Sequence, residues 1–120
     1  RIVYKDFPIL GAASVQAAKA ALASRSQGHH QAFHEALFTA KGELTNEQIL
    51  QIAKDVGLDA QKLAADMDNP EWLAIIERNR ALASDLGITG TPAFVVGMEL
   101  VPGAVDLTTL KDLVARARTR

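Results

Sequence analysis

The hydrophobic spacing of this sequence changes at Gly87 from helical to extended, which limits the chain to folds that combine helices with a sheet. Before Gly87, apolar residues recur every three or four positions. After it, the runs 93–96 and 99–101 flank Gly97-Met98, a pattern typical of an antiparallel hairpin with glycine at the first central position of its turn. Asp106 then offers a side-chain cap to a last helix, so the segment beyond Gly87 is predicted to be strand, strand and helix.

Five helices are expected between residues 12 and 87. The third is the best marked, because Thr45 and Gln48 have the spacing of a capping box. Asp59 can cap the fourth helix, and Asn69-Pro70 can begin the fifth with a cap residue followed by proline at the first helical position. The predicted helical segments are 12–23, 29–40, 45–57, 59–67 and 70–87.

The first residues are predicted to form a strand over 1–9, because β-branched and aromatic residues fill a short run that Pro8 closes. The sequence contains no internal repeat and no low-complexity linker. We therefore expect one partial α/β domain over residues 1–120, with the strand at 1–9, a helical insertion at 12–87 and a strand–strand–helix segment at 91–120.

Composition excludes several kinds of partner. The 120 residues are 48% hydrophobic and carry a formal net charge of −1, so the chain can form a core but has no electrostatic footprint for nucleic acid. Its apolar runs are far shorter than the roughly 20 residues of a membrane-spanning helix. We expect neither nucleic-acid binding nor membrane insertion.

The sequence contains no cysteine, and this absence limits its chemistry. No disulfide, thiol nucleophile or thiolate ligand can come from these residues. His30 and His34 share one face of a predicted helix, a spacing that can hold zinc, but Glu35 lies about 100° away around the helix. We expect no metal and no cofactor, and we interpret His34 and Trp72 as packing residues.

Gly90-Thr91-Pro92 is the sharpest local motif. Proline cannot donate a hydrogen bond to a sheet and therefore favours the first residue of a strand. The run 87–96, with 100–104 and the capped last helix, closely resembles the last third of DsbA-like thiol–disulfide oxidoreductases. Residues 1–9 resemble the strand that follows the active-site helix of that family, and the intervening helices resemble its inserted helical subdomain.

The resemblance implies a thioredoxin-like fold with a helical insertion, here lacking the first strand and the active-site helix. It also implies that Pro92 is cis and that Thr91 lies opposite a Cys-x-x-Cys motif, which this chain does not contain. The expected site residues are therefore Thr91, whose backbone groups meet a substrate strand, and Pro92, which shapes the site. No catalytic residue is expected in the chain itself.

The function implied by the resemblance is that of a portion of an oxidoreductase that exchanges disulfides with extended protein substrates outside the bacterial cytoplasm, in the periplasm or a similar compartment. Without a thiolate, this chain alone is expected to be redox-inert. The missing first strand leaves backbone groups unpaired. Upstream residues, a cleaved piece that stays bound, or a strand from a second copy in a swapped homodimer can complete the sheet.

Two other readings of the sequence remain open. Kappa-type glutathione transferases and chromene-carboxylate isomerases share the scaffold, but they usually have valine before the proline and a tryptophan-glycine-x-aspartate turn after the last strand. This chain has Thr91 and the run 102–105 at those places. The remaining alternative is a non-catalytic, peptide-binding protein with a thioredoxin fold.

Overall fold

The computed structural model describes residues 1–42 and 44–119, so Arg120, at the end of the predicted segment 91–120, lies outside the described residues. The chain divides into two units, Arg1–Arg80 and Ala81–Arg120. The described sheet contains the two hairpin strands alone.

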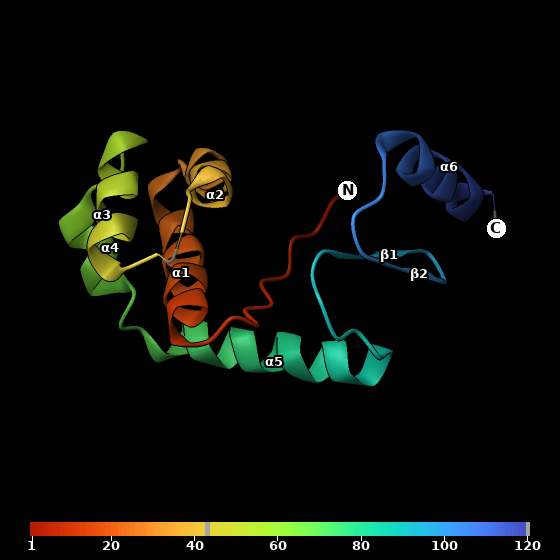
Figure 1. Ribbon diagram of the computed structural model, residues 1–120, viewed down its shortest axis with the longest axis horizontal. Helices are drawn as coiled ribbons and strands as arrows, with labels where there is room; N and C mark the ends of the chain where they lie inside the picture. Colours follow the sequence, from red (N-terminus) through yellow and green to blue (C-terminus); the bar gives the residue numbers. More distant parts are fainter. Residues whose placement is uncertain (43, 120) are drawn as a thin grey trace. The chain divides into compact units, whose positions relative to one another are not determined.

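The first unit, which we call the helical unit, contains α1 (Ala12–Ala23), a 3-10 segment η1 (Ser24–Gln27), α2 (His30–Thr39), α3 (Asn46–Asp55), α4 (Ala60–Asp66) and most of α5 (Pro70–Leu86). Helix α1 contacts α2, α3 and α4 (Figure 1). The core of the helical unit is a cluster of buried apolar residues from these helices and the loop after α3: Ala20, Ala23, Phe33, Ile49, Ala53, Leu58, Leu63 and Met67. The five predicted helices all form.

The capping box predicted at the start of α3 is confirmed. The Gln48 backbone N–H donates to the Thr45 hydroxyl at 3.2 Å, and the Thr45 backbone N–H donates to Gln48 Oε1 at 3.1 Å. Two backbone donors that the helix itself leaves without partners are thereby satisfied. The cap fixes the first turn of the helix that delivers Ile49 to the core.

Replacing Thr45 by alanine is expected to lower the free energy of unfolding of the helical unit by about 1 kcal/mol, since one capping hydrogen bond is lost. Urea denaturation followed by far-ultraviolet circular dichroism measures the change. Thr39→Ala is the matched control, because the Thr39 hydroxyl donates only to Ala36 O within its own exposed helix end. Equal losses in the two variants would show that the cap contributes nothing specific.

The strand predicted over residues 1–9 is not formed, and this corrects the sequence analysis. Residues 1–9 form neither helix nor strand, and the described sheet has only the strands β1 and β2. A run with strand-like composition becomes a strand only when another strand supplies its hydrogen-bond partners. Instead, the segment contacts the helical unit: Pro8 is buried, and Asn79 Nδ2 donates to Asp6 O at 2.9 Å.

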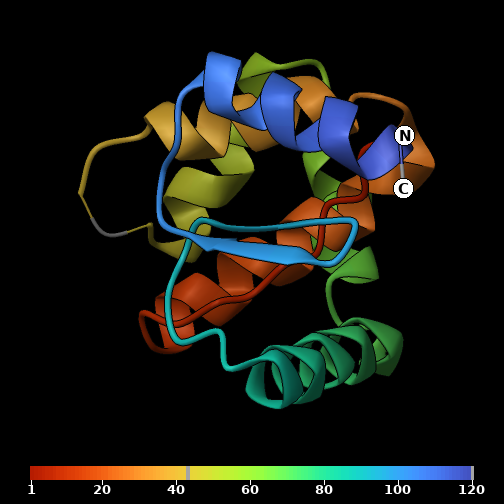
Figure 2. The ribbon, with the colours of Figure 1, turned by 90° about the vertical axis from the view of Figure 1, so that its right-hand side faces the viewer.

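The second unit, which we call the hairpin unit, contains the end of α5, β1 (Ala93–Val96), β2 (Glu99–Pro102) and α6 (Leu107–Arg118). The strands pair antiparallel from Ala93 with Pro102 to Val96 with Glu99, as predicted (Figure 2). Helix α6 contacts β1 and buries Leu113.

Asp106 caps α6 as the sequence predicts. Its carboxylate Oδ1 accepts from the Thr109 backbone N–H at 2.8 Å. Hydrogen bonds from the Thr109 side chain and backbone lower the pKa of Asp106, because they stabilise the ionised carboxylate. None of the helices in the described ranges is long and apolar enough to cross a membrane.

Candidate functional site

The loop before β1 carries the two site residues that the sequence predicts. Helix α5 closes with backbone hydrogen bonds from Gly87 to Ser84 O and from Ile88 to Ala83 O, at 3.1 and 2.8 Å. The loop then reaches Thr91 and Pro92, which are both exposed, and the peptide bond between them is cis, the isomer that the resemblance implies. Both residues therefore lie at the surface of the hairpin unit.

One hydrogen bond joins the loop before β1 to the residue that follows β2. The Gly103 backbone N–H donates to Pro92 O at 2.8 Å, one step beyond the last register pair, Ala93 with Pro102. Proline has no N–H of its own, so Pro92 can take part in such pairing only through its carbonyl. Thr91 thus stands directly before the point at which the paired backbone begins.

A surface hollow of about 270 Å³ lies at this loop. Its lining consists of main chain, glycine, proline and apolar or hydroxyl side chains, and none of the lining residues is titratable. Such a surface can receive an extended backbone, but it cannot supply a nucleophile or a general acid or base. The residues that line the hollow are 87–93, Leu100, Pro102 and Gly103.

The sheet of the hairpin unit offers a second binding feature. In the described sheet, β1 and β2 pair only with each other, so the outer edge of each strand carries unpaired backbone groups. Val95 and Leu100 are 55% and 41% exposed. An extended segment can therefore add to this sheet by backbone pairing while covering apolar side chains.

A second cluster of polar groups lies in the helical unit, around Asp6, and the sequence analysis missed it. Burial raises the pKa of Asp6 above its ordinary value of 3.8, and the nearby Arg25, His34 and His30 offset part of this rise. The signal that could have indicated it is Asp6 itself, the only carboxylate among residues 1–9, directly after Lys5.

The two histidines singled out by their spacing lie in this cluster and contact neighbouring groups. The His34 ring packs against Tyr4 and Phe38, with ring centroids 5.2 and 4.7 Å apart. His30 Nδ1 lies 2.9 Å from Ala21 O and 3.0 Å from Ser24 Oγ. Among the described residues, no group of three or more histidine and carboxylate side chains is placed to hold a metal ion.

Trp72 has the packing role that its spacing predicts. It is partly buried against the core cluster of the helical unit, and its indole Nε1 donates to Asp66 O at 2.6 Å. A buried indole N–H normally requires such an acceptor. Trp72 therefore belongs to the core and has no part in the site.

Comparison with known proteins gives consistent matches over nearly the whole chain. A family model described as the DSBA-like thioredoxin domain matches residues 1–115. The structure is similar to that of a thioredoxin-like oxidoreductase from Silicibacter pomeroyi DSS-3, with a TM-score of 0.93 and 49% identity over 98% of this chain and 68% of that chain. It is also similar to the thiol-disulfide exchange protein α-DsbA2 from Wolbachia pipientis, with a TM-score of 0.88 and 36% identity over 95% of this chain and 63% of that chain.

Two further proteins are similar to this chain. ScsC from Proteus mirabilis, in a compact conformation, gives a TM-score of 0.86 and 28% identity over all of this chain and 66% of that chain. Among curated proteins, the Na⁺/H⁺ antiporter NhaA of Herminiimonas arsenicoxydans is 30% identical over 102 residues, which are 85% of this chain but 16% of the antiporter. The chain thus spans about two thirds of these solved relatives and a small part of the antiporter.

Proposed function

Because this chain belongs to the DSBA-like thioredoxin domain family, we propose that it is a portion of a thiol–disulfide oxidoreductase that acts on the disulfides of extracytoplasmic proteins. The family and the thioredoxin-like fold are those that the sequence analysis predicted. The observation that carries the proposal is the position of Thr91 and Pro92, exposed at the entrance to the hairpin, within a chain that the family model matches from residue 1 to residue 115.

The proposed reaction needs two sets of residues. Thr91 and Pro92 are in this chain, whereas the cysteine pair that exchanges disulfides is not. Disulfide exchange requires a thiolate that attacks one sulfur of a disulfide and releases the other as a thiolate. None of the 120 residues is a cysteine. The proposed role of this chain is therefore to bind: the backbone at Thr91 pairs with an extended substrate segment, and Pro92 shapes the hollow beside it.

Partners and location follow from the same proposal. The substrates are extended protein segments, which suit both the main-chain lining of the hollow and the open sheet edges. A strand from upstream residues or from a second copy completes the sheet. An extracytoplasmic location is supported by a similar structure, described as a periplasmic thioredoxin-like protein from Salmonella enterica serovar Typhimurium, which is 31% identical over 97% of this chain.

The proposal is tested by supplying the missing thiols. The chain alone is expected to show no disulfide exchange above the rate without protein, measured as oxidation of a dithiol peptide. Joining it to an N-terminal segment that carries a Cys-x-x-Cys motif at the start of a helix is expected to produce exchange. The same fusion with serine for both cysteines of that motif is the matched control, and it should be inactive.

A non-catalytic peptide-binding module is the second candidate, and the absence of cysteine favours it. The same fusion separates the two. A folded fusion that binds the oxidised peptide but does not exchange its disulfide would support the binding module and contradict the oxidoreductase. An active fusion whose Thr91→Pro variant loses peptide binding would support the oxidoreductase, because proline removes the backbone N–H at that position.

A further inference from the structure

The segment 1–9 is attached to the helical unit by contacts of three kinds. Asp6 O accepts a hydrogen bond from Asn79 of α5, the Tyr4 ring packs on His34 of α2, and Pro8 is buried. The Asp6 carboxyl lies in the same region, with Arg25, His30 and His34 as its charged neighbours. The segment is thus held by one hydrogen bond from a side chain to its backbone, one ring contact and the burial of Pro8.

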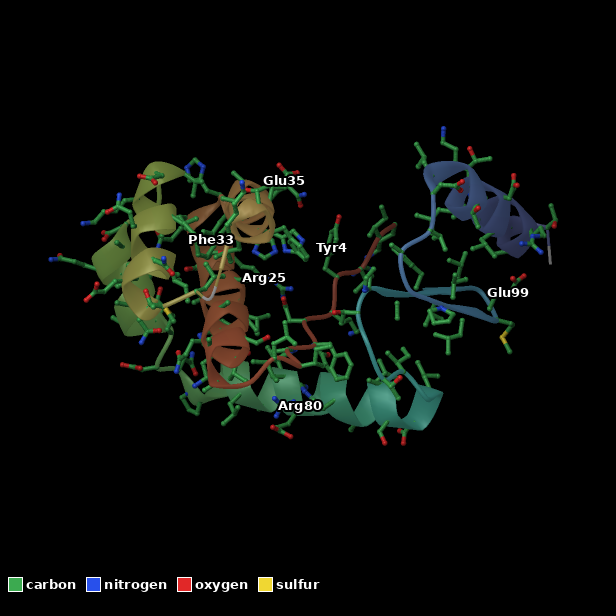
Figure 3. The ribbon with its side chains drawn as sticks, in the orientation of Figure 1. Tyr4, Arg25, Phe33, Glu35, Arg80 and Glu99 are labelled. Carbon is green, nitrogen blue, oxygen red and sulfur yellow. The ribbon has the colours of Figure 1, made fainter. Side chains whose placement is uncertain are left out.

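A hollow of about 310 Å³ adjoins the Asp6 carboxyl. This volume admits several waters, since one water occupies about 30 Å³ of liquid. Tyr4 of the segment and Arg25, which follows α1, both line it (Figure 3). Asp6, which also lines this hollow, is half-buried, and its carboxyl can exchange a proton with water there.

Hydrogen bonds fix the position of the His30 ring. Ala21 O can only accept, so His30 Nδ1, 2.9 Å away, carries a hydrogen and donates to it. Ser24 Oγ also donates to Ala21 O, at 2.7 Å. His30 is thereby held in place as one of the charged neighbours of Asp6.

The charges around Asp6 come from every element that packs against it. Arg25 comes from η1, His30 and His34 from α2, and the neutral Asn79 from α5. The segment itself adds Arg1 and Lys5, which line the same hollow. Asp6 is the only carboxylate among these groups. Its neighbours are the permanently charged Arg25 and the two histidines, with Arg1 and Lys5 lining the same hollow.

We propose that Asp6, Arg25, His30 and His34 form a pH-sensitive latch that holds the segment 1–9 on the helical unit at acidic pH and loosens it as the pH rises. The latch does not depend on the proposed redox function, because it uses no thiol and no substrate. Its consequence is that pH determines how firmly the helical unit holds a segment with the composition of a strand.

The direction of the effect follows from the Asp6 carboxyl. Because the attached state raises the pKa of Asp6, the protonated carboxyl favours attachment. This contribution is complete below the ordinary carboxyl pKa of 3.8 and is lost as the pH rises through the raised value. Attachment therefore weakens as the pH rises.

The single tyrosine of the chain makes the latch measurable. With tyrosine labelled by ¹³C, the ring of Tyr4 gives one set of nuclear magnetic resonance signals in the full 120-residue chain. We expect these signals to move, as the pH rises through the raised pKa of Asp6, from a shifted position toward that of a free peptide of residues 1–9. Asp6→Asn mimics the protonated carboxyl, and its signals should stay near the attached position.

The Asp6→Asn variant also separates the latch from any other effect of pH on the Tyr4 ring, which contacts the His34 ring directly. Signals that move equally in the native chain and in Asp6→Asn would overturn the proposal, as would native signals that do not move. Arg25→Gln provides a second variant and should release the segment at lower pH, because it removes the permanent cation. Unchanged fluorescence of Trp72 shows that each variant is folded.

Discussion

Replacing Phe33 by alanine is expected to lower the free energy of unfolding of the helical unit by about 3–5 kcal/mol. Phe33 is fully buried, and it joins α2 to the core cluster formed mainly by α1, α3 and α4. Removing the ring takes away its buried apolar surface and leaves a cavity that the neighbouring helices fill only in part. Since small domains have a total stability of about 5–15 kcal/mol, the loss should leave the unit marginally stable.

Trp72 provides the measurement, because it is the only tryptophan and packs against the same cluster. Urea denaturation followed by its fluorescence gives the midpoint for each variant. Phe38→Ala is the matched control: it is the same substitution on the same helix, but Phe38 is 77% exposed and should lose less than about 0.5 kcal/mol. Equal shifts of the midpoint would contradict the placement of Phe33 in the core.

The helices could be predicted from the sequence because their ends are marked by local chemistry. Thr45, Asp59 and Asp106 each accept a hydrogen bond from a backbone N–H in the first turn of the helix that follows. Such caps involve residues three positions apart, so the printed sequence already contains both partners. The segment η1 was missed because residues 24–27 have no apolar spacing, and the 3-10 turn there continues directly from α1.

The features that the sequence could not predict depend on residues far apart in the chain. The strand over 1–9 required a neighbouring strand, and the described residues provide none for it. The cluster around Asp6 brings together positions 6, 25, 30, 34 and 79, and no spacing pattern connects them. Thr91 and Pro92 could be placed, by contrast, because a proline before an apolar run marks the beginning of a strand by its own covalent structure.

Replacing Gly97 by alanine is expected to destabilise the hairpin unit by about 2–5 kcal/mol, and two separate effects contribute. Gly97 is the first central residue of the two-residue turn between Val96 and Glu99, and its φ is 61°. A side chain at positive φ costs about 1–2 kcal/mol. A Cβ at this position would also lie 3.0 Å from the Cβ of Ala117 on α6, so the turn or the helix must move, at a further cost of about 1–3 kcal/mol.

Gly103→Ala distinguishes the two effects. Gly103 also has positive φ, 80°, but a Cβ there would meet no atom within 4 Å, so only the backbone cost of about 1–2 kcal/mol applies. Hydrogen exchange of the β1 and β2 amides measures the stability of the hairpin in each variant. Ala117→Gly in the Gly97→Ala background should recover the contact part, since it removes the Cβ that the new side chain meets. If it recovers nothing, and Gly97→Ala and Gly103→Ala lose equal stability, then the close approach of the turn to α6 does not contribute.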